Sequence, residues 1–229
     1  MNTPLISFCT TCKGRLWQLE KTLFRNLLTL NENSEIVLLN YQSPDNLEEY
    51  IFSNFKKELE SGKLKYYSLQ DSFSFTMSYA KNVAHKLASG NILFNLDADN
   101  YIYQGLQEEL SNLKDNEIHI PIYLNLNSKE GCYGRLGYSK KLFYKLNGYD
   151  ETILGMKADD YDLVQRSLNK FKTKQIQAKR SVSCIQNSKE EKLLYTKRSS
   201  SDLPYPPVNY PKTWGKATVL DHNGVLINI

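Results

Sequence analysis

The chain has 229 residues, of which 41% are hydrophobic and 24% are charged, so it can bury a sizeable core in one large domain or two small ones. Its formal net charge of +4 is mild for this length, which suits an anionic small molecule and does not indicate a nucleic-acid-binding protein. Cys9 and Cys12 form a CxxC, but no second pair completes a zinc site. Because we find no basic leader and no apolar segment of membrane-spanning length, we expect reduced thiols and a cytoplasmic location.

Strands and helices are predicted to alternate through the first hundred residues. Apolar runs predict strands over residues 5–10, 35–40, 63–69 and 92–96, and apolar residues at helical spacing predict helices over residues 16–30, 44–59 and 75–89. Such alternation with short connections favours a parallel sheet with right-handed crossovers. The first turn is not GxGxxG and no P-loop is present, so neither a dinucleotide site nor a kinase-type triphosphate site is expected.

The second half of the chain has a less regular pattern. It predicts antiparallel strands over residues 118–126 and 132–138, further strands over 174–177 and 182–185, and helices over 104–113, 139–146 and about 160–168. From residue 187 the chain is charged and then rich in Ser and Pro, which predicts a mobile or wrapping C-terminal segment.

Two aspartates end the fourth predicted strand. Side chains alternate along a strand, so Asp97 and Asp99 leave the same face at its carboxyl end, where open α/β sheets bind ligands. Two adjacent carboxylates repel each other unless a cation or a proton lies between them, and Mg²⁺ or Mn²⁺ prefers such oxygen ligands. A polar turn after the strand is the structural alternative.

A second acidic group opens the predicted helix after residue 158. Asp159, Asp160 and Asp162 are placed where negative charge stabilises a helix N-terminus, and on their own they are explained by that role. Asp160 has a further chemical possibility. Crowding by Asp159 and Asp162 raises the basicity of the Asp160 carboxylate.

Together these segments resemble inverting glycosyltransferases of the GT-A fold, in the group that includes family 2 and the β-1,4-galactosyltransferases. Asp97-Ala98-Asp99 is similar to the DxD motif of that group, and residues 155–166 (GMKADDYDLVQR) are similar to its Gly-Trp-Gly-Gly-Glu-Asp-Asp-Asp segment. Ser78–Asn82 resembles the helix start that precedes the metal motif. The resemblance covers roughly residues 4–170. Met156 and Asp159 depart from the Trp and Glu of the family pattern, which bears on the identity of donor and acceptor.

The resemblance implies a role for each group of residues. Asp160 is implied as the catalytic base, with Asp159 helping to hold the acceptor, and Mn²⁺ or Mg²⁺ is implied at Asp99 and Asp97. His222 is a candidate third metal ligand from the tail, although a turn residue is the simpler interpretation of Asp-His-Asn-Gly. The implied donor-binding residues come from the ends of the first two strands, the third predicted helix and the metal motif: Thr10, Thr11, Arg15, Asn40, Asp45, Lys81 and Asp97.

The implied function is a metal-dependent hexosyltransferase. It would transfer a sugar from a nucleotide sugar, with UDP-sugar expected, to a hydroxyl of a glycan or glycoconjugate by one inverting displacement. Polysaccharide biosynthesis and peripheral membrane association through a lipid-linked acceptor are compatible with this function, and a nucleic-acid partner is not expected. Two alternatives stay open: a sugar-1-phosphate nucleotidyltransferase, which would need a glycine-rich basic loop where residues 11–15 have one glycine, and a non-catalytic sugar-binding module.

The expected fold is therefore α/β, with a GT-A (Rossmann-like) mixed, mainly parallel sheet flanked by helices. We expect one domain over residues 1–186, with a nucleotide-binding half (1–100) and an acceptor-binding half (101–186). Residues 187–229 are expected to form an irregular C-terminal extension that closes over the active site.

Overall fold

A computed structural model describes residues 6–72, 75–122, 134–153, 158–180, 183–188 and 213–229. Within these residues, one nine-stranded sheet has the order β7-β5-β6-β4-β1-β2-β3-β8-β9. Its central strands β4, β1, β2 and β3 are parallel, whereas β6 and β8 run antiparallel to their neighbours at either side. The strands are β1 (Ile6–Cys12), β2 (Ser34–Asn40), β3 (Leu64–Leu69), β4 (Ile92–Asn95), β5 (Glu117–Ile120), β6 (Gly137–Ser139), β7 (Lys174–Gln177), β8 (Thr218–Asp221) and β9 (Leu226–Asn228).

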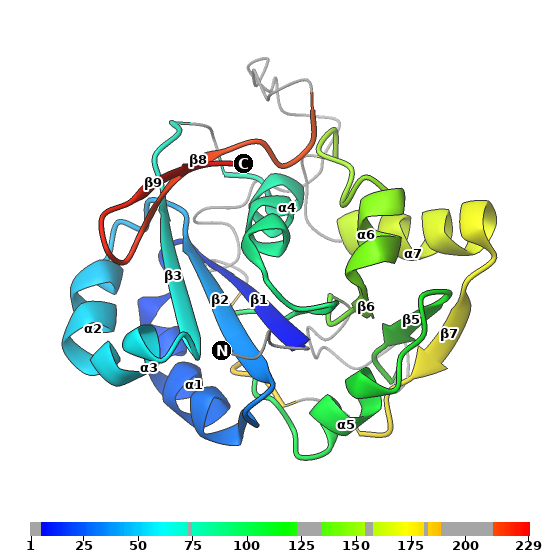
Figure 1. Cartoon of the computed structure of the whole chain (residues 1–229), viewed down its shortest axis with the longest axis horizontal. Coiled ribbons are helices and arrows are strands. Elements are labelled where there is room, and N and C mark those ends of the chain that lie inside the picture. The colour runs from blue at the N-terminus through cyan, green and yellow to red at the C-terminus, as the bar shows by residue number, and fades with distance from the viewer. Residues whose placement is uncertain (1–5, 73–74, 123–133, 154–157, 181–182, 189–212) are drawn as a thin grey trace.

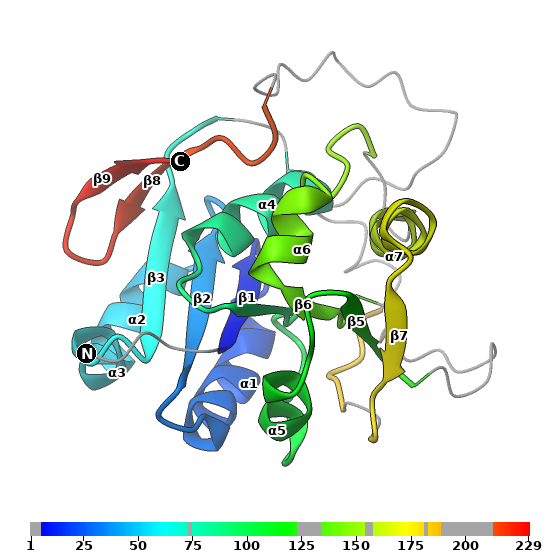
Figure 2. The ribbon, with the colours of Figure 1, turned by 45° about the vertical axis from the view of Figure 1, so that its right-hand side comes forward.

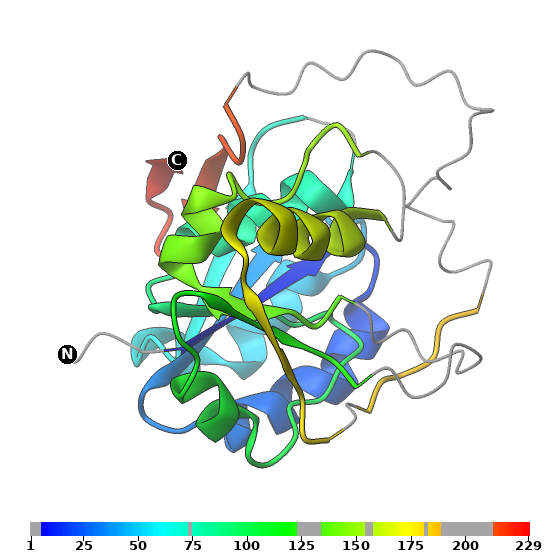
Figure 3. The ribbon, with the colours of Figure 1, turned by 90° about the vertical axis from the view of Figure 1, so that its right-hand side faces the viewer.

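Helices cover both faces of the sheet (Figure 1). One face packs against α1 (Leu16–Thr29), α2 (Leu47–Asn54), α3 (Lys56–Glu60) and α5 (Leu106–Ser111). The other face packs against α4 (Met77–Leu87), α6 (Lys140–Lys145) and α7 (Ala158–Phe171). In Figure 3, α7 and the strand β7 that follows it face the viewer. This three-layer arrangement confirms the predicted α/β fold class.

The central strands are apolar at nearly every position because both of their faces are buried. In β1, Phe8 packs into the core beneath α1, and the next residue, Cys9, packs into the core beneath α4. Ser7, also buried, donates a hydrogen bond to Glu35 on the neighbouring strand at 2.6 Å. Continuous burial explains why these strands could be recognised from short apolar runs alone.

One predicted helix is divided in two. The sequence predicted a helix over residues 44–59, and the structure has α2 and α3, separated at Phe55. Phe55 leaves the helical conformation, with φ of −125°, and buries its ring against Tyr50, with the ring centroids 5.6 Å apart. Burial of this aromatic ring outweighs the continuation of the helix.

The C-terminal residues extend the sheet, which the sequence analysis did not predict. β8 pairs antiparallel with β3, and β9 pairs with β8, so the hairpin forms the outer edge of the sheet (Figure 2). Its turn contains Asn223 and Gly224, and Gly224 has a φ of +79° that favours glycine. The Asp221 carboxylate accepts hydrogen bonds from the backbone N–H groups of Asn223 and Val225. The Asn-Gly pair between apolar runs was an available hairpin signal.

The chain before this hairpin is anchored by Trp214. Its ring meets the rings of Phe143 and Tyr144 edge to face, with centroids 5.6 and 5.3 Å away, and the Lys86 ammonium lies 4.4 Å from the centre of the Trp214 ring. Residues 187–229 were expected to close over the active site, and of these, residues 189–212 lie outside the described residues. Among the helices that the structure describes, none combines the length and the apolar character needed to cross a membrane.

Candidate active site

The candidate site lies where the order of the parallel strands reverses, between β1 and β4. From β1 the chain continues to β2 and β3 on one side, while β4 pairs on the other side. Ligands bind at such a switch point in open α/β sheets, outside the carboxyl ends of the strands. The predicted residues after β1, after β2 and after β4 all follow parallel strands, so they share this edge.

A buried lysine joins the acidic start of α7 to helix α4. Lys81 Nζ donates hydrogen bonds to Asp159 Oδ2 and to Asp160 Oδ1, both at 2.7 Å. The Lys81 side chain is 3% exposed, that of Asp159 3% and that of Asp160 15%, so this ion-pair cluster is largely shielded from water. Lys81 also lies 4.9 Å from the centre of the Tyr149 ring. The structure therefore uses Lys81 to hold the two aspartates.

The cluster has unusual electrostatics. Burial alone lowers the pKa of Lys81, but the negative charges of Asp159, Asp160 and Asp97 outweigh it and raise that pKa above its ordinary value. Burial, together with the charges of Asp159 and Asp97, raises the pKa of Asp160 to about 7, although Lys81 opposes this shift. A carboxylate with this pKa is a competent proton acceptor near neutral pH.

Gly134 makes room for the Asp160 carboxylate. A Cβ atom at this position would lie 2.8 Å from Asp160 Oδ2, closer than a side chain tolerates. Asn95 Nδ2 donates a hydrogen bond to the carbonyl oxygen of Gly134 and another, at 3.1 Å, to Asp97 Oδ1. Asn95 and Gly134 thus bring the loop after β4 close to the start of α7.

Asp99 lies in the same loop, beside Asp97. Burial and the charge of Asp97 raise the pKa of Asp99 to about 6, against the opposing effects of Arg135 and of a hydrogen bond from Asn187. Asn187 Nδ2 donates to Asp99 Oδ2 at 2.6 Å. Arg135, only 1% exposed, donates from Nη2 to Asn100 Oδ1 on the other side of the loop.

The two loop aspartates fit a hard divalent cation. Their oxygens are the preferred ligands of Mg²⁺ and Mn²⁺, and their mutual repulsion is the reason a cation would be favoured there. Across the described residues, no group of three or more His, Cys, Asp or Glu side chains gathers as a closed metal site. Mg²⁺ sites commonly combine one or two carboxylates with oxygens from water or a substrate, and Asp97 and Asp99 are carboxylates of this kind.

His222 requires a correction. It follows β8, which runs antiparallel to β3 and brings Asp221 opposite Tyr67. The antiparallel direction carries the hairpin turn away from the carboxyl end of β3, and three strands separate β8 from β4. His222 therefore does not meet Asp97 or Asp99 in this structure, and the predicted third metal ligand is not found there.

The predicted donor-binding residues lie along the ends of β1 and β2, where several have partners within the protein. Asn40 donates from Nδ2 to the Tyr66 hydroxyl, and its Oδ1 accepts from the Ser43 N–H, both at 2.7 Å. Thr10 is buried in β1, and Thr11 is partly exposed beside it. These contacts shape the loops, and a donor-binding role for the three residues stays a prediction.

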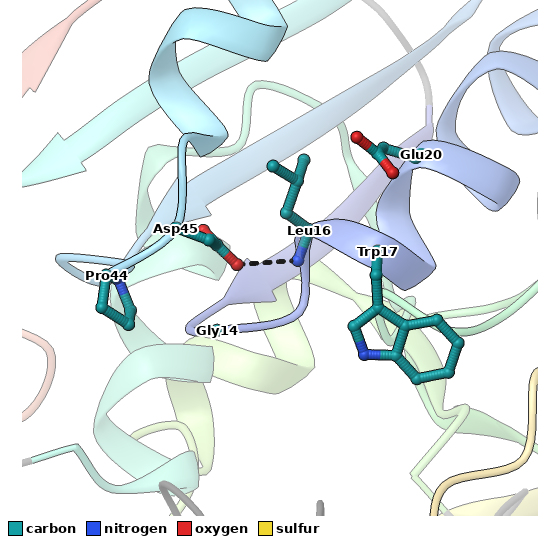
Figure 4. Close-up of a pocket in the computed structure, with 6 residues that line it drawn as sticks. All are labelled: Gly14, Leu16, Trp17, Glu20, Pro44 and Asp45. Atoms are coloured by element: carbon teal, nitrogen blue, oxygen red, sulfur yellow. Dashed lines mark hydrogen bonds between the residues drawn. The ribbon is translucent and has the colours of Figure 1, made fainter.

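Asp45 has a structural contact at the start of α1. Its Oδ2 accepts a hydrogen bond from the Leu16 N–H at 3.0 Å, which caps the helix from the loop after β2 (Figure 4). Asp45 and Gly14 also line an open pocket of about 480 Å³ between the two loops, with Pro44 and Trp17 on either side. The predicted nucleotide edge therefore contains a hollow, and a donor-binding role for Asp45 stays a prediction.

Sequence analysis missed several residues that hold the β4 loop. On α1, the buried side chains of Gln18, Thr22 and Asn26 recur at four-residue spacing. Thr22 Oγ1 donates to the Ala98 carbonyl at 2.7 Å. Asn26 Nδ2 donates to the Asn100 carbonyl, and Asn26 Oδ1 accepts from the Ile102 N–H, both at 2.8 Å. Polar residues flanking the buried leucines of α1 were a signal that the apolar pattern alone did not use.

Similar folds occur among solved structures. A 1–349 fragment of S. aureus TarS in complex with UDP-GlcNAc matches with a TM-score of 0.63 and 14% identity, covering 84% of this chain and 62% of that one. The mannosyltransferase PcManGT from Pyrobaculum calidifontis, in complex with GDP-Man and Mn²⁺, matches with a TM-score of 0.62 and 15% identity, covering 78% and 55%. The catalytic domain of Drosophila β1,4-galactosyltransferase 7, in complex with xylobiose, matches with a TM-score of 0.58 and 12% identity, covering 87% and 77%.

These structures confirm the predicted fold, that of GT-A glycosyltransferases. No protein-family model matches the chain, and no curated protein is similar to it in sequence. The chain spans about three fifths of the TarS fragment, 62% of its length. What this chain itself binds and transfers is argued next from its own residues.

Proposed function

We propose that the chain is an inverting glycosyltransferase that transfers a sugar from a nucleotide-sugar donor, expected to be a UDP-sugar, to a hydroxyl group of a glycan or glycoconjugate. The observation that carries the proposal is the convergence of Asp160 and Asp97 on one edge of a GT-A sheet. Asp160 lies beside Gly134, and Asn95 donates hydrogen bonds both to the Gly134 carbonyl and to Asp97. A carboxylate of raised pKa and a pair of carboxylates for a cation are the two chemical parts that such a transfer needs.

Asp160 is proposed as the catalytic base. It takes the proton from the acceptor hydroxyl while that oxygen attacks the anomeric carbon from the face opposite the leaving nucleotide. The Lys81 ammonium keeps the carboxylate in place through Oδ1, and Gly134 leaves room beside Oδ2. One displacement inverts the anomeric centre, so no nucleophile from the protein is needed.

Asp159 is proposed to support the base from beside it. Its Oδ2 shares the Lys81 ammonium with Asp160, so the negative charge of Asp159 keeps the pKa of Asp160 raised. Because Asp159 is almost fully buried, its direct contact with an acceptor, which the resemblance implies, stays a prediction.

Asp99 and Asp97 are proposed to hold Mn²⁺ or Mg²⁺ together with the donor diphosphate. When bound, the cation supplies Lewis-acid stabilisation of the charge that develops on the leaving phosphate. Arg15, at the turn after β1, lies close enough to influence the charge of Asp99 and is proposed to contact the same phosphates. The solved structures with UDP-GlcNAc and with GDP-Man and Mn²⁺ support a donor of this kind.

A donor screen tests the proposal directly. Purified chain is incubated with Mn²⁺ and a panel of UDP-, GDP- and other nucleotide sugars, and release of the free nucleotide is measured. Wild type should hydrolyse or transfer at least one donor, with a β-linked product from an α-linked donor. Asp160→Asn should keep donor binding and lose transfer by about 10²–10⁴-fold, the usual range for loss of a general base. Equal turnover by wild type and Asp160→Asn would exclude Asp160 as the base.

A further inference from the structure

Asn187 connects three segments that are far apart in the chain. Its side-chain oxygen accepts hydrogen bonds from Arg15 Nη1 and from Gln18 Nε2, both at 2.5 Å. Its side-chain nitrogen donates to Asp99 Oδ2 at 2.6 Å. Because Arg15 has donors only and Gln18 presents its NH₂ group, the Asn187 oxygen must face them and its N–H groups must face Asp99. The network therefore determines the orientation of the Asn187 amide.

The backbone around Asn187 is also fixed against the loop after β4. The Ile185 N–H donates to the Asp99 carbonyl at 2.8 Å, and the Tyr101 N–H donates to the Ser183 carbonyl at 3.0 Å. Cys184 and Asn100 form an antiparallel bridge between these two bonds. The segment 183–188 thus lies along the loop that carries Asp97 and Asp99, and the position of Asn187 does not depend on its side chain alone.

Gln18 on α1 also holds Asn187 beside the loop that carries Asp99. It is buried on α1, one turn before Thr22, which binds the Ala98 carbonyl of the same loop. One face of α1 therefore binds both the loop that carries Asp99, through Thr22, and Asn187, through Gln18. The buried Gln18 amide needs a hydrogen-bond partner, since leaving it unpaired would cost free energy, and Asn187 is that partner.

We infer that Asn187 is a positioning residue of the proposed cation site: through its bond to Oδ2 it fixes the Asp99 carboxylate that would hold the cation, and it holds Arg15 beside the same carboxylate. Within the described residues, Oδ2 is the Asp99 oxygen for which a hydrogen bond is found. Hydrogen-bond partners of metal-binding carboxylates orient them, and losing such a partner commonly lowers metal affinity about 10–100-fold. This inference rests on the proposed function.

The test is an isothermal calorimetric titration of the full chain with Mn²⁺ alone, without nucleotide, which measures the Mn²⁺ affinity. Asn187→Ala is compared with wild type and with Asn223→Ala, a matched change in the exposed β8–β9 turn. Asn187→Ala should bind Mn²⁺ about 10–100-fold more weakly, and Asn223→Ala should bind as wild type does. Melting temperatures of the three proteins are measured without Mn²⁺, because a residue with a purely structural role would lower the melting temperature and leave the affinity unchanged.

The outcomes separate the inference from the proposed function. Equal Mn²⁺ affinity in folded Asn187→Ala and in wild type overturns the inference and leaves the transferase proposal standing. Absence of Mn²⁺ binding in wild type, with or without UDP, overturns both. If Asn187→Ala does not fold, Gln18→Met removes one of the two donors that orient Asn187 and should weaken Mn²⁺ binding by a smaller factor; unchanged affinity in that variant would overturn the inference.

Discussion

Lys81 shows how the surroundings of one residue change its chemical role. In the sequence analysis it was a candidate donor-binding residue, because Ser78–Asn82 resembles the helix start that precedes the metal motif of the family. In the structure its ammonium is buried and hydrogen-bonded to Asp159 and Asp160. Its phosphate contact stays a prediction, while its contact with the proposed base is observed. A buried charge needs such partners, since removing it from water is costly.

The raised pKa of Asp160 predicts a pH profile. A base must be ionised to accept a proton, so kcat/KM should rise about tenfold per pH unit below about 7 and level off above it, because kcat/KM reports the free enzyme. Initial rates between pH 5.5 and 8.5 at low donor and acceptor concentrations measure this. A flat profile over that range would contradict the assignment of Asp160.

The same pKa shift has a consequence for stability. The folded chain binds a proton on Asp160 up to about pH 7, whereas the unfolded chain releases it near the ordinary value of 3.8. The contribution of this group therefore declines as pH rises from about 4 to 7. Asp160→Asn lacks this titration, so its melting temperature relative to wild type should increase over that pH interval.

At the scale of elements, α1 has two functions in the fold. Its leucines Leu19, Leu23 and Leu27 bury an apolar stripe against the sheet. Its polar residues Thr22 and Asn26 bind the backbone of the loop that carries Asp97 and Asp99. The helix therefore positions the loop of the proposed cation site and also forms part of the core.

Asn26→Ala tests the supporting role of α1. The substitution removes the partners of the Asn100 carbonyl and the Ile102 N–H, and leaving buried backbone groups unpaired costs about 1–3 kcal/mol. Urea unfolding at pH 7 should show a loss of this size. The control is Asn54→Ala at the exposed end of α2, which should change the free energy of unfolding by less than about 0.5 kcal/mol. A similar small change in Asn26→Ala would contradict this role.

The β8–β9 hairpin is the element that changes the sequence-based picture most. Residues 187–229 were predicted to form an extension beyond the domain, yet β8 and β9 complete the same sheet next to β3. Asn187, also in that range, contacts Asp99. The proposed boundary at residue 187 therefore runs through the sheet and through the candidate site, and the closing role of the extension stays a prediction.

At the scale of the molecule, the candidate site draws on segments from β1 to the residues after β7. Ligands that bind these segments should stabilise the folded chain as a whole. With UDP and Mn²⁺ at about 100 times their dissociation constant, mass action adds about 2.7 kcal/mol. For a chain of this size that corresponds to a rise in melting temperature of roughly 5–10 °C. Differential scanning fluorimetry with UDP, CTP and GDP, each with and without Mn²⁺, measures it.

The controls for this experiment are ligand-based and variant-based. UDP without Mn²⁺ should give a smaller shift, and Asp99→Ala should lose the part of the shift that depends on Mn²⁺. A molecule that gains no stability from any nucleotide, with or without the cation, would contradict the proposed function. A larger shift with CTP than with UDP would instead favour a nucleotidyltransferase.

Local pattern in the sequence determined the fold class, most of the elements and the acidic segments of the candidate site. Burial requires the central strands to be apolar, and the helices between them have apolar residues at helical spacing, so the sequence alone predicts both. Tertiary structure alone decided which distant side chains lie together. It paired Lys81 with Asp159 and Asp160, brought Asn187 to Asp99, and carried His222 to the other end of β3. These contacts join residues 78 to 88 positions apart or depend on strand direction, and nothing in a local pattern encodes either one.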